Sequence, residues 1–360
     1  MFMIREVHPR DLDQLETLAV HLNTVNLPAD RDRLARLIDH SRKSFGDELP
    51  HSEREYVFGM TTGEGLIGTA MIIAQHGTFE RPAVYFNILP EQKYSRTLQK
   101  YFVHQVLQLS FTFDGATEIG GLILDPSYQG HPMKLGKILS FSRFLYIGMF
   151  RDRFRDQIIA ELLPQLNDDG SSALWECLGA NFTELSYREA DQLSRENVEF
   201  IRSLFPQTPI YTALLPEEVR EKIGVVGAPT RPVEKMLRDL GFEWDRSIDP
   251  FDGGPTFVCK TEDCRMVQRT HWVKVAGALT EGEIGEGRAL VGSDKAFDEI
   301  RFREVLTGYQ RIPNGYLFEE EALQALGVAP GDSVGILPLS GKDIEDFHRV
   351  SVDEGLWKQC

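Results

Sequence analysis

A glutamate in an apolar stretch is the first residue whose surroundings suggest chemistry. Glu161 stands in the segment IIAEL, residues 158–162, where a carboxylate is expected to be partly buried. A buried carboxylate needs a partner or carries a raised pKa, and a raised pKa suits a group that transfers protons. Glu161 is therefore a candidate catalytic residue.

Two aspartates and a glycine pair form a second distinctive cluster. The segment SIDPFDGGPTF holds Asp249 and Asp252, and Gly253 and Gly254 follow at once. Two carboxylates beside a tight turn could hold a cationic substrate. Alternatively, Asp252 could cap the turn through backbone amides, as aspartates commonly do. The sequence leaves both interpretations open.

A third candidate is an anion site at the start of a helix. The apolar segment 118–124 predicts a buried strand, residues 127–136 a loop, and residues 137–154 a long helix. Amides in the first turn of a helix lack acceptors within the helix and favour phosphate groups. Lys134 and Lys137 flank this point, although an ordinary loop with surface lysines fits the same pattern.

Motifs of several other enzyme classes are missing from the sequence. There is no GxGxxG with an acidic residue about 20 positions later, no GxxxxGK[ST] phosphate loop, no GxSxG, no HExxH and no CxxC. Cys259, Cys264 and His271 supply only three ligands for a metal ion. We therefore expect no metal site.

The remaining pattern predicts alternating strands and helices. Residues 56–60 and 66–74 read as a hairpin, residues 93–107 as a helix through Leu98 and Phe102, and residues 232–241 as a helix that ends at a glycine. From residue 271 onward short strands dominate. We predict a larger domain over residues 1–270, a small β-rich domain over 271–345 and a charged tail over 346–360.

Composition excludes some partners. The 360 residues include 55 acidic and 39 basic side chains, a net charge of −16. Binding to a nucleic acid backbone would have to overcome this charge, so nucleic acid is not an expected partner. No apolar run approaches the roughly 20 residues of a membrane span, and no secretory signal is visible. These features predict a cytoplasmic protein without a membrane anchor.

Several segments together resemble the arginine N-succinyltransferases. They are MIREVHPRDL at residue 3, GDELPHSEREYVF at 46, LILDP at 122, LSFSRFLYIGMFRDRF at 139, IIAEL at 158, ALWECLGANF at 173, PIYTALLP at 209 and IDPFDGGPTFVC at 248. The resemblance runs nearly end to end, and the last segment is its most specific part.

The resemblance implies both a fold and a reaction. Members of this family resemble GNAT-type acyltransferases, which implies an α/β (α+β) fold with a mixed sheet, here joined to the small β-rich C-terminal domain. It also implies that the α-amino group of L-arginine attacks the thioester of succinyl-CoA, giving N2-succinylarginine and CoA in arginine catabolism. Homo- or hetero-oligomers are expected, because some relatives work as two-chain assemblies.

Site residues follow from the same resemblance. The acyl-CoA is expected along Leu122, Ile123 and Leu124 and at the loop before the helix, at Lys134, Gly136 and Lys137. The amine substrate is expected at Asp249, Asp252, Gly253 and Gly254, together with Glu161.

One position departs from the family pattern. The family places a histidine, assigned as proton donor, in a GQVHP segment, and Gly227 stands at that position here. A thiol has a pKa near 8.5, so CoA can leave as the thiolate without a donor. Water or Tyr211 could supply the proton instead.

This departure keeps two alternatives open. The chain could acylate a different amine or use a different acyl-CoA. It could also be a non-catalytic CoA-binding subunit.

Overall fold

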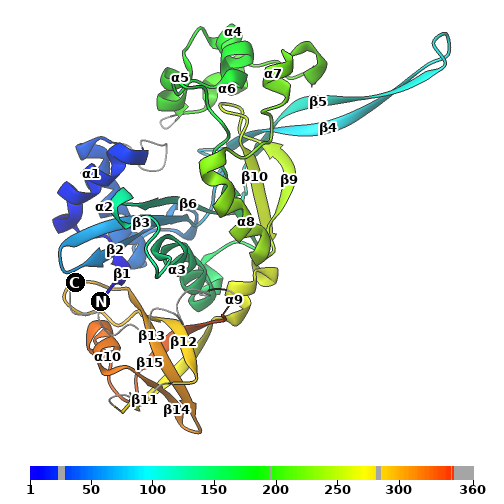
Figure 1. The fold of residues 1–360 in the computed structure, drawn as a ribbon. Coiled ribbons are helices and arrows are strands. Elements are labelled where there is room, and N and C mark those ends of the chain that lie inside the picture. The colour runs from blue at the N-terminus through cyan, green and yellow to red at the C-terminus, as the bar shows by residue number, and fades with distance from the viewer. Residues whose placement is uncertain (23–28, 195–196, 281–284, 342, 344–360) are drawn as a thin grey trace. The chain divides into compact units, whose positions relative to one another are not determined.

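The computed structural model describes residues 1–22, 29–194, 197–280, 285–341 and 343 (Figure 1). Its internal contacts divide the chain into two units. Unit 1 comprises Met1–Ala74, Ile119–Phe154 and Arg265–Cys360, and unit 2 comprises Gln75–Glu118 and Arg155–Cys264. The predicted boundaries at residues 270 and 345 do not coincide with these units, and they stay a prediction. The tail over 346–360 lies outside the described residues.

The described residues of unit 1 form paired strands, some of which close into a ring, and five helices. Its strands are β1 (Met3–Glu6), β2 (Glu55–Thr62), β3 (Gly65–Ile73), most of β6 (Thr117–Leu124), β11 (His271–Ala278), β12 (Gly287–Ser293), β13 (Arg303–Ile312), β14 (Gly315–Phe318) and β15 (Ser333–Leu339). Its helices are α1 (Leu12–Leu22), α2 (Arg31–Phe45), α3 (Leu135–Met149), α9 (Arg265–Arg269) and α10 (Glu320–Leu326), with short 3₁₀ turns η1 (Pro9–Asp11), η2 (His51–Glu53), η3 (Pro126–Tyr128) and η4 (Arg151–Arg153).

The strands after residue 271 close on themselves. β12 pairs with β15, β15 with β11, β11 with β14, β14 with β13, and β13 again with β12. This ring surrounds an apolar core that includes Val291, Phe318 and Ile336, with α10 packed on it. The C-terminal part is therefore β-rich, as predicted. The sheet is mixed, because β11 and β14 run parallel while the other pairs of the ring are antiparallel.

Aromatic rings fix helix α3 on the sheet of unit 1. Tyr146 of α3 contacts Tyr56 and Phe58 of β2, with ring centroids 4.9 and 5.4 Å apart, and Phe45 of α2 at 5.3 Å. All four rings are buried. Aromatic pairs at these distances each add about 0.5–1.5 kcal/mol beyond the area they bury. The long apolar helix predicted after residue 136 is confirmed, and it begins at Leu135.

Unit 2 consists of strands that pair side by side and a group of short helices. Its strands are β4 (Ala83–Ser95), β5 (Lys100–Thr112), β7 (Gln157–Glu161), β8 (Ile210–Tyr211), β9 (Glu243–Ile248) and β10 (Pro255–Lys260), in the order β7–β10–β9–β4–β5–β8. Its helices are α4 (Ala180–Thr183), α5 (Tyr187–Ser194), α6 (Glu199–Leu204), α7 (Glu217–Arg220) and α8 (Arg231–Leu240), with the π-helical turn η5 (Trp175–Gly179) and the 3₁₀ turns η6 (Thr212–Leu214), η7 (Ala228–Thr230) and η8 (Thr261–Asp263). Its core centres on Trp175, whose ring stacks on Phe251 at 5.1 Å.

The helix predicted over residues 93–107 is wrong. This segment forms the turn and outer strand of a long hairpin, in which β4 and β5 pair from Ala83↔Thr112 to Ser95↔Lys100. Two cross-strand pairs, Phe86↔Leu109 and Ile88↔Leu107, lie in the core of unit 2. Their burial outweighs the helical spacing of Leu98 and Phe102, which are both exposed.

A buried glutamate without partners gives a test of the strand ring. Glu304 of β13 is fully buried, neither carboxylate oxygen has a hydrogen-bond partner, and burial raises its pKa well above the usual range. A raised folded-state pKa gives stability below the unfolded pKa that is lost as the pH rises. We expect Glu304→Met to raise the free energy of unfolding by about 1–3 kcal/mol at pH 8 and by less at pH 4.

Urea unfolding of both proteins at the two pH values measures this effect. Glu53→Met, at an exposed glutamate of η2, is the control. An equal gain at pH 4 and pH 8 would mean that the Glu304 carboxyl is not what limits stability.

Candidate active site

Three predicted carboxylates come together at one end of the sheet in unit 2. β10 pairs antiparallel with β7, with Thr256 opposite Glu161, and also with β9, with Pro255 opposite Ile248. Glu161 is the last residue of β7, and the turn with Asp249 and Asp252 joins β9 to β10. The shared strand therefore brings the glutamate and the aspartate turn to the same sheet end.

The two aspartates hold the turn. Asp249 Oδ1 accepts hydrogen bonds from the amides of Phe251 at 2.6 Å and Asp252 at 3.3 Å. Asp252 Oδ1 accepts one from the amide of Gly254 at 2.7 Å. The capping interpretation of Asp252 is thus confirmed. Each aspartate uses Oδ1 for these bonds, so capping does not prevent the other oxygen from contacting a ligand.

The glycines of the turn are required by its geometry. Gly253 has φ +81°, a conformation that other residues rarely adopt. A Cβ at Gly254 would lie 2.4 Å from the carbonyl oxygen of Leu162 and 2.9 Å from Asp252 Oδ1. The turn therefore packs directly on the residue after Glu161, and the glycines act through the backbone.

Crowding of the carboxylates shifts their titration. Loss of water around Glu161, followed by the charge of Glu118, raises the pKa of Glu161 to about 7. Burial and then the charge of Glu161 raise the pKa of Asp249 to about 7. Burial and the charge of Asp249 raise the pKa of Asp252 well above its usual range. Such mutual repulsion is typical of carboxylates that share one site.

Glu161 is more open to solvent than the sequence predicts. Along β7, Ile158 and Ala160 are buried, whereas Gln157 and Glu161 are exposed. Side chains alternate between the two faces of a strand, so the apolar neighbours of Glu161 in sequence point to the opposite face. The side chain is therefore open to solvent on one side, although the surrounding protein removes water from its carboxylate. A group that is crowded by protein atoms on most sides but open on one can both titrate near neutrality and reach a ligand.

A histidine that no sequence motif indicates lies beside this cluster. His76 Nδ1 lies 2.8 Å from Glu118 Oε2, and Glu118 is buried. Burial alone would lower the pKa of His76, but the charges of Glu118, Glu161 and Asp249 outweigh it and raise the pKa to about 9. His76 therefore carries a positive charge next to the carboxylates. It stands in no motif, and only the fold reveals its partner 42 residues away.

Tyr211 lies on another part of unit 2. It belongs to β8, opposite Val106 of β5, and its ring contacts His104 with centroids 5.6 Å apart. Lys93 Nζ lies 6.0 Å from the centre of the same ring. These contacts join Tyr211 to the β4–β5 hairpin and not to the carboxylates. They do not support a role of Tyr211 in proton transfer, which stays a prediction.

The predicted acyl-CoA residues lie together in unit 1. Leu122, Ile123 and Leu124 end strand β6, and Gly136 and Lys137 lie in the first turn of α3. The N-cap residue Lys134 is in the left-handed conformation, φ 51° and ψ 48°, and makes no side-chain capping bond. The first amides of α3 are thus not capped by a side chain from within the turn, which suits an anion site.

An irregularity in β6 precedes these residues. Gly121 has φ +56° inside the strand, and its carbonyl accepts a hydrogen bond from Thr69 Oγ1 at 3.1 Å. The neighbouring carbonyl of Gly120 accepts one from the buried Arg143 of α3 at 3.2 Å. A positive φ inside a strand marks a bulge, which changes the direction of the following backbone groups. Arg143 therefore fixes α3 on this strand.

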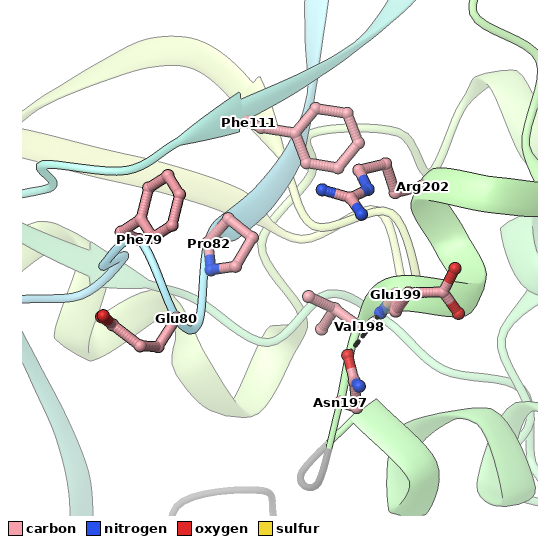
Figure 2. A pocket seen from close by; sticks show the side chains of 8 residues that line it. All are labelled: Phe79, Glu80, Pro82, Phe111, Asn197, Val198, Glu199 and Arg202. Atoms are coloured by element: carbon pink, nitrogen blue, oxygen red, sulfur yellow. Dashed lines mark hydrogen bonds between the residues drawn. The ribbon is translucent and has the colours of Figure 1, made fainter.

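A separate cavity of about 240 Å³ lies elsewhere in unit 2 (Figure 2). Figure 2 shows the Arg202 guanidinium beside Phe111, with Asn197 accepting a hydrogen bond from the amide of Glu199 at 2.8 Å. None of the predicted site residues lines this cavity.

The described part of the chain shows neither a cluster of metal ligands nor a helix that could span a membrane. No group of three or more His, Cys, Asp or Glu side chains there could hold a metal ion. Among its helices, none has the length and apolar character needed to cross a lipid bilayer.

Comparison with known proteins identifies the family. Residues 2–266 match the protein family described as "Arginine N-succinyltransferase beta subunit". Relatives named arginine N-succinyltransferase, from Salmonella arizonae and Escherichia coli, are each 31% identical to this chain over 350 residues, which cover 95% of this chain and 99% of the relative. The chain belongs to the arginine N-succinyltransferase family. The predicted family and the acyltransferase class are confirmed.

A solved structure of the arginine N-succinyltransferase family shares the fold. Subunit AI of the arginine/ornithine succinyltransferase from Pseudomonas aeruginosa superimposes with a TM-score of 0.79 at 27% identity, covering 94% of this chain and 99% of that one. The α/β fold predicted from the family resemblance is therefore confirmed.

Gly227, the departure from the expected family histidine, has a structural role. Its amide donates to the carbonyl of Leu163 at 3.0 Å, and a Cβ at this position would lie 2.6 Å from the carbonyl oxygen of Pro164. Two backbone segments approach more closely here than a side chain permits. This approach fixes the chain immediately after Glu161.

A substitution at Gly227 tests this packing. We expect Gly227→Ala to reduce the free energy of unfolding by about 1–3 kcal/mol, because the added methyl group separates the two segments. We expect Gly227→His to lose stability as well and to gain no turnover. Thermal unfolding and steady-state rates measure both effects.

Gly63→Ala is the control, because a Cβ there would meet no atom within 4 Å. A stable Gly227→His variant with higher turnover would show that the close approach is not required.

Proposed function

We propose that this chain transfers the succinyl group of succinyl-CoA to the α-amino group of L-arginine. The observation that carries the proposal is the group of Glu161, Asp249 and Asp252 in unit 2 of a member of the arginine N-succinyltransferase family. The three carboxylates raise one another's pKa values, and none of them forms a salt bridge with a described cation.

A cationic acceptor would relieve this repulsion. The guanidinium of arginine is planar and always charged, and it pairs with carboxylates through two parallel hydrogen bonds. Asp249 and Asp252 are fixed by their turn, so they present their oxygens in a defined geometry. We assign these two residues to the cationic substrate and the glycines to holding the turn.

Glu161 is the proposed base. The α-amino group of arginine is mostly protonated at neutral pH and must lose a proton before it attacks. A carboxylate with a pKa of about 7 accepts that proton better than one with the usual value. The amine nitrogen then attacks the thioester carbon, the carbon–sulfur bond breaks, CoA leaves as the thiolate, and the nitrogen gives its second proton to that thiolate or to water. The thiolate needs little assistance, since its pKa is near 8.5.

Unit 1 supplies the proposed acyl-CoA site. The first-turn amides of α3, together with Lys134 and Lys137, would hold the pyrophosphate. Backbone groups of residues 122–124 would pair with the pantetheine amides. Assembly as a homo- or hetero-oligomer and a cytoplasmic location remain predictions.

Thiol release measures the activity directly. The purified chain is incubated with succinyl-CoA and one amine at a time, while free CoA is followed with a thiol reagent. Release with arginine supports the proposal, and ornithine is included because the Pseudomonas relative carries it in its name. Release only with another amine would show that arginine is not the acceptor. Binding of CoA without turnover with any amine would overturn the proposal that the chain is catalytic.

Asp252→Asn separates substrate binding from the fold of the turn. The amide keeps an oxygen that can accept from Gly254, but it removes the charge. We expect KM for arginine to rise about tenfold or more, with KM for succinyl-CoA changed less than twofold. Lys137→Ala is the matched variant and should show the reverse pattern. Equal effects of Asp252→Asn on both constants would remove Asp252 from the amine site.

The charge of His76 gives a prediction for the pH profile. If Glu161 is the base, the rate rises with pH through a value of about 7. The positive charge of His76 lowers the pKa of Glu161, whereas the charge of Glu118 raises it. We therefore expect His76→Gln to move the acidic limb of kcat/KM to higher pH. The double variant His76→Gln/Glu118→Gln removes both charges and should return the limb toward pH 7.

Initial rates between pH 5.5 and 9.5 measure the limb, and His51→Gln, at an exposed histidine of η2, is the control. An unchanged limb in His76→Gln would show that Glu161 is not the titrating base.

A further inference from the structure

The outer half of the β4–β5 hairpin extends beyond the rest of its sheet. We call residues 89–104 the arm. β9 pairs with β4 only at Phe86 and Asn87, and β8 pairs with β5 only at Val106 and Leu107, so the pairing with both neighbours ends before the arm begins. Figure 1 shows the two strands continuing past the other elements of unit 2. The arm is thus a two-stranded ribbon, and such ribbons are marginally stable alone in water.

The arm exposes an unusual amount of apolar surface. From residue 92 to residue 103, every side chain except that of Ser95 is exposed. The large apolar side chains of the arm have exposed fractions between 41% and 61%. They are Leu89, Tyr94, Leu98, Tyr101, Phe102 and Val103. Several large apolar side chains exposed together on one short ribbon indicate a binding surface, whereas single exposed apolar residues do not.

The outer edges of the arm also carry backbone groups available for pairing. Beyond Asn87 on β4 and before Val106 on β5, no strand of the described residues pairs with the hairpin from outside. Natural proteins usually protect long edges with charges, prolines or a cover. Here Pro90 and Lys93 interrupt one edge only in part. A cover supplied by another chain would satisfy these groups.

The charge of the arm indicates which molecule covers it. The arm contains Lys93, Arg96 and Lys100 but only one acidic residue, Glu91, so it is basic within a chain of net charge −16. Surfaces that associate tend to have complementary potentials. A second copy of this chain is an acidic body to which a basic arm is attracted.

We propose that the arm binds a second copy of this chain, so that each copy places its arm on the acidic surface of the other. Such a reciprocal contact is isologous and closes at two copies. The apolar side chains supply the buried area, and the basic residues orient the contact. This inference does not rest on the proposed reaction.

Sedimentation velocity of the full chain between 0.5 and 50 µM tests the proposal. We expect a dimer. The variant Tyr94→Ser/Leu98→Ser/Val103→Ser removes three apolar groups of the arm and should weaken dimerisation at least tenfold. The control Val20→Ser/Leu204→Ser/Leu214→Ser removes three equally exposed apolar groups outside the arm and should leave the dimer intact.

A second variant covers the case in which the serine variant fails to fold. Arg96→Glu/Lys100→Glu keeps the apolar surface but reverses the charge of the arm, and it should also weaken dimerisation at least tenfold at low salt. Circular dichroism verifies the fold of each variant. A wild-type chain that stays monomeric at 50 µM, or a dimer that both arm variants leave unchanged, would overturn the proposal.

Discussion

The pairing of β10 with two strands is the constraint on which the candidate acceptor site depends. β10 forms antiparallel ladders with β7 and with β9, so the end of β7 and the turn after β9 must lie at the same sheet end. Backbone hydrogen bonds therefore force Glu161 close to Asp249 and Asp252, although the three carboxylates repel one another. The repulsion is a property of the fold and is retained because the ladders outweigh it.

This arrangement favours a ligand over a self-contained network. His76 neutralises part of the charge through Glu118, whereas among the described residues the side chains of both aspartates accept hydrogen bonds only from backbone amides of their own turn. Carboxylates with raised pKa values bind a cation more tightly as they ionise, so the folded chain gains stability when a cationic molecule occupies the cluster. The turn fixes the carboxylates without a ligand, and for a ligand that binds there such prior order reduces the entropy lost on binding.

The sequence predicted local structure well where a segment's own pattern decided it. The strand before residue 124, the helix after it and the aspartate turn all followed from periodicity, glycines and capping. The prediction for the hairpin arm was wrong because the arm has no buried face. The apolar spacing of Leu98 and Phe102 was therefore mistaken for that of a helix. His76 was missed because its partner Glu118 comes near only when β6 and the segment before β4 are folded. Contacts of this kind are not encoded in any local pattern.

Backbone contacts at the same end of the sheet explain why a glycine stands at position 227. In the segment 224–227, the amide of Gly224 donates a hydrogen bond to the carbonyl of Gly253 at 2.9 Å. The amide of Gly227 donates one to the carbonyl of Leu163 at 3.0 Å. The segment thus bonds to the aspartate turn on one side and to the continuation of β7 on the other. A side chain at Gly227 would push against Pro164 and separate the two halves of the carboxylate cluster. The glycine at this position thus holds the two halves of the carboxylate cluster together, and any proton donor for the proposed reaction would have to come from elsewhere.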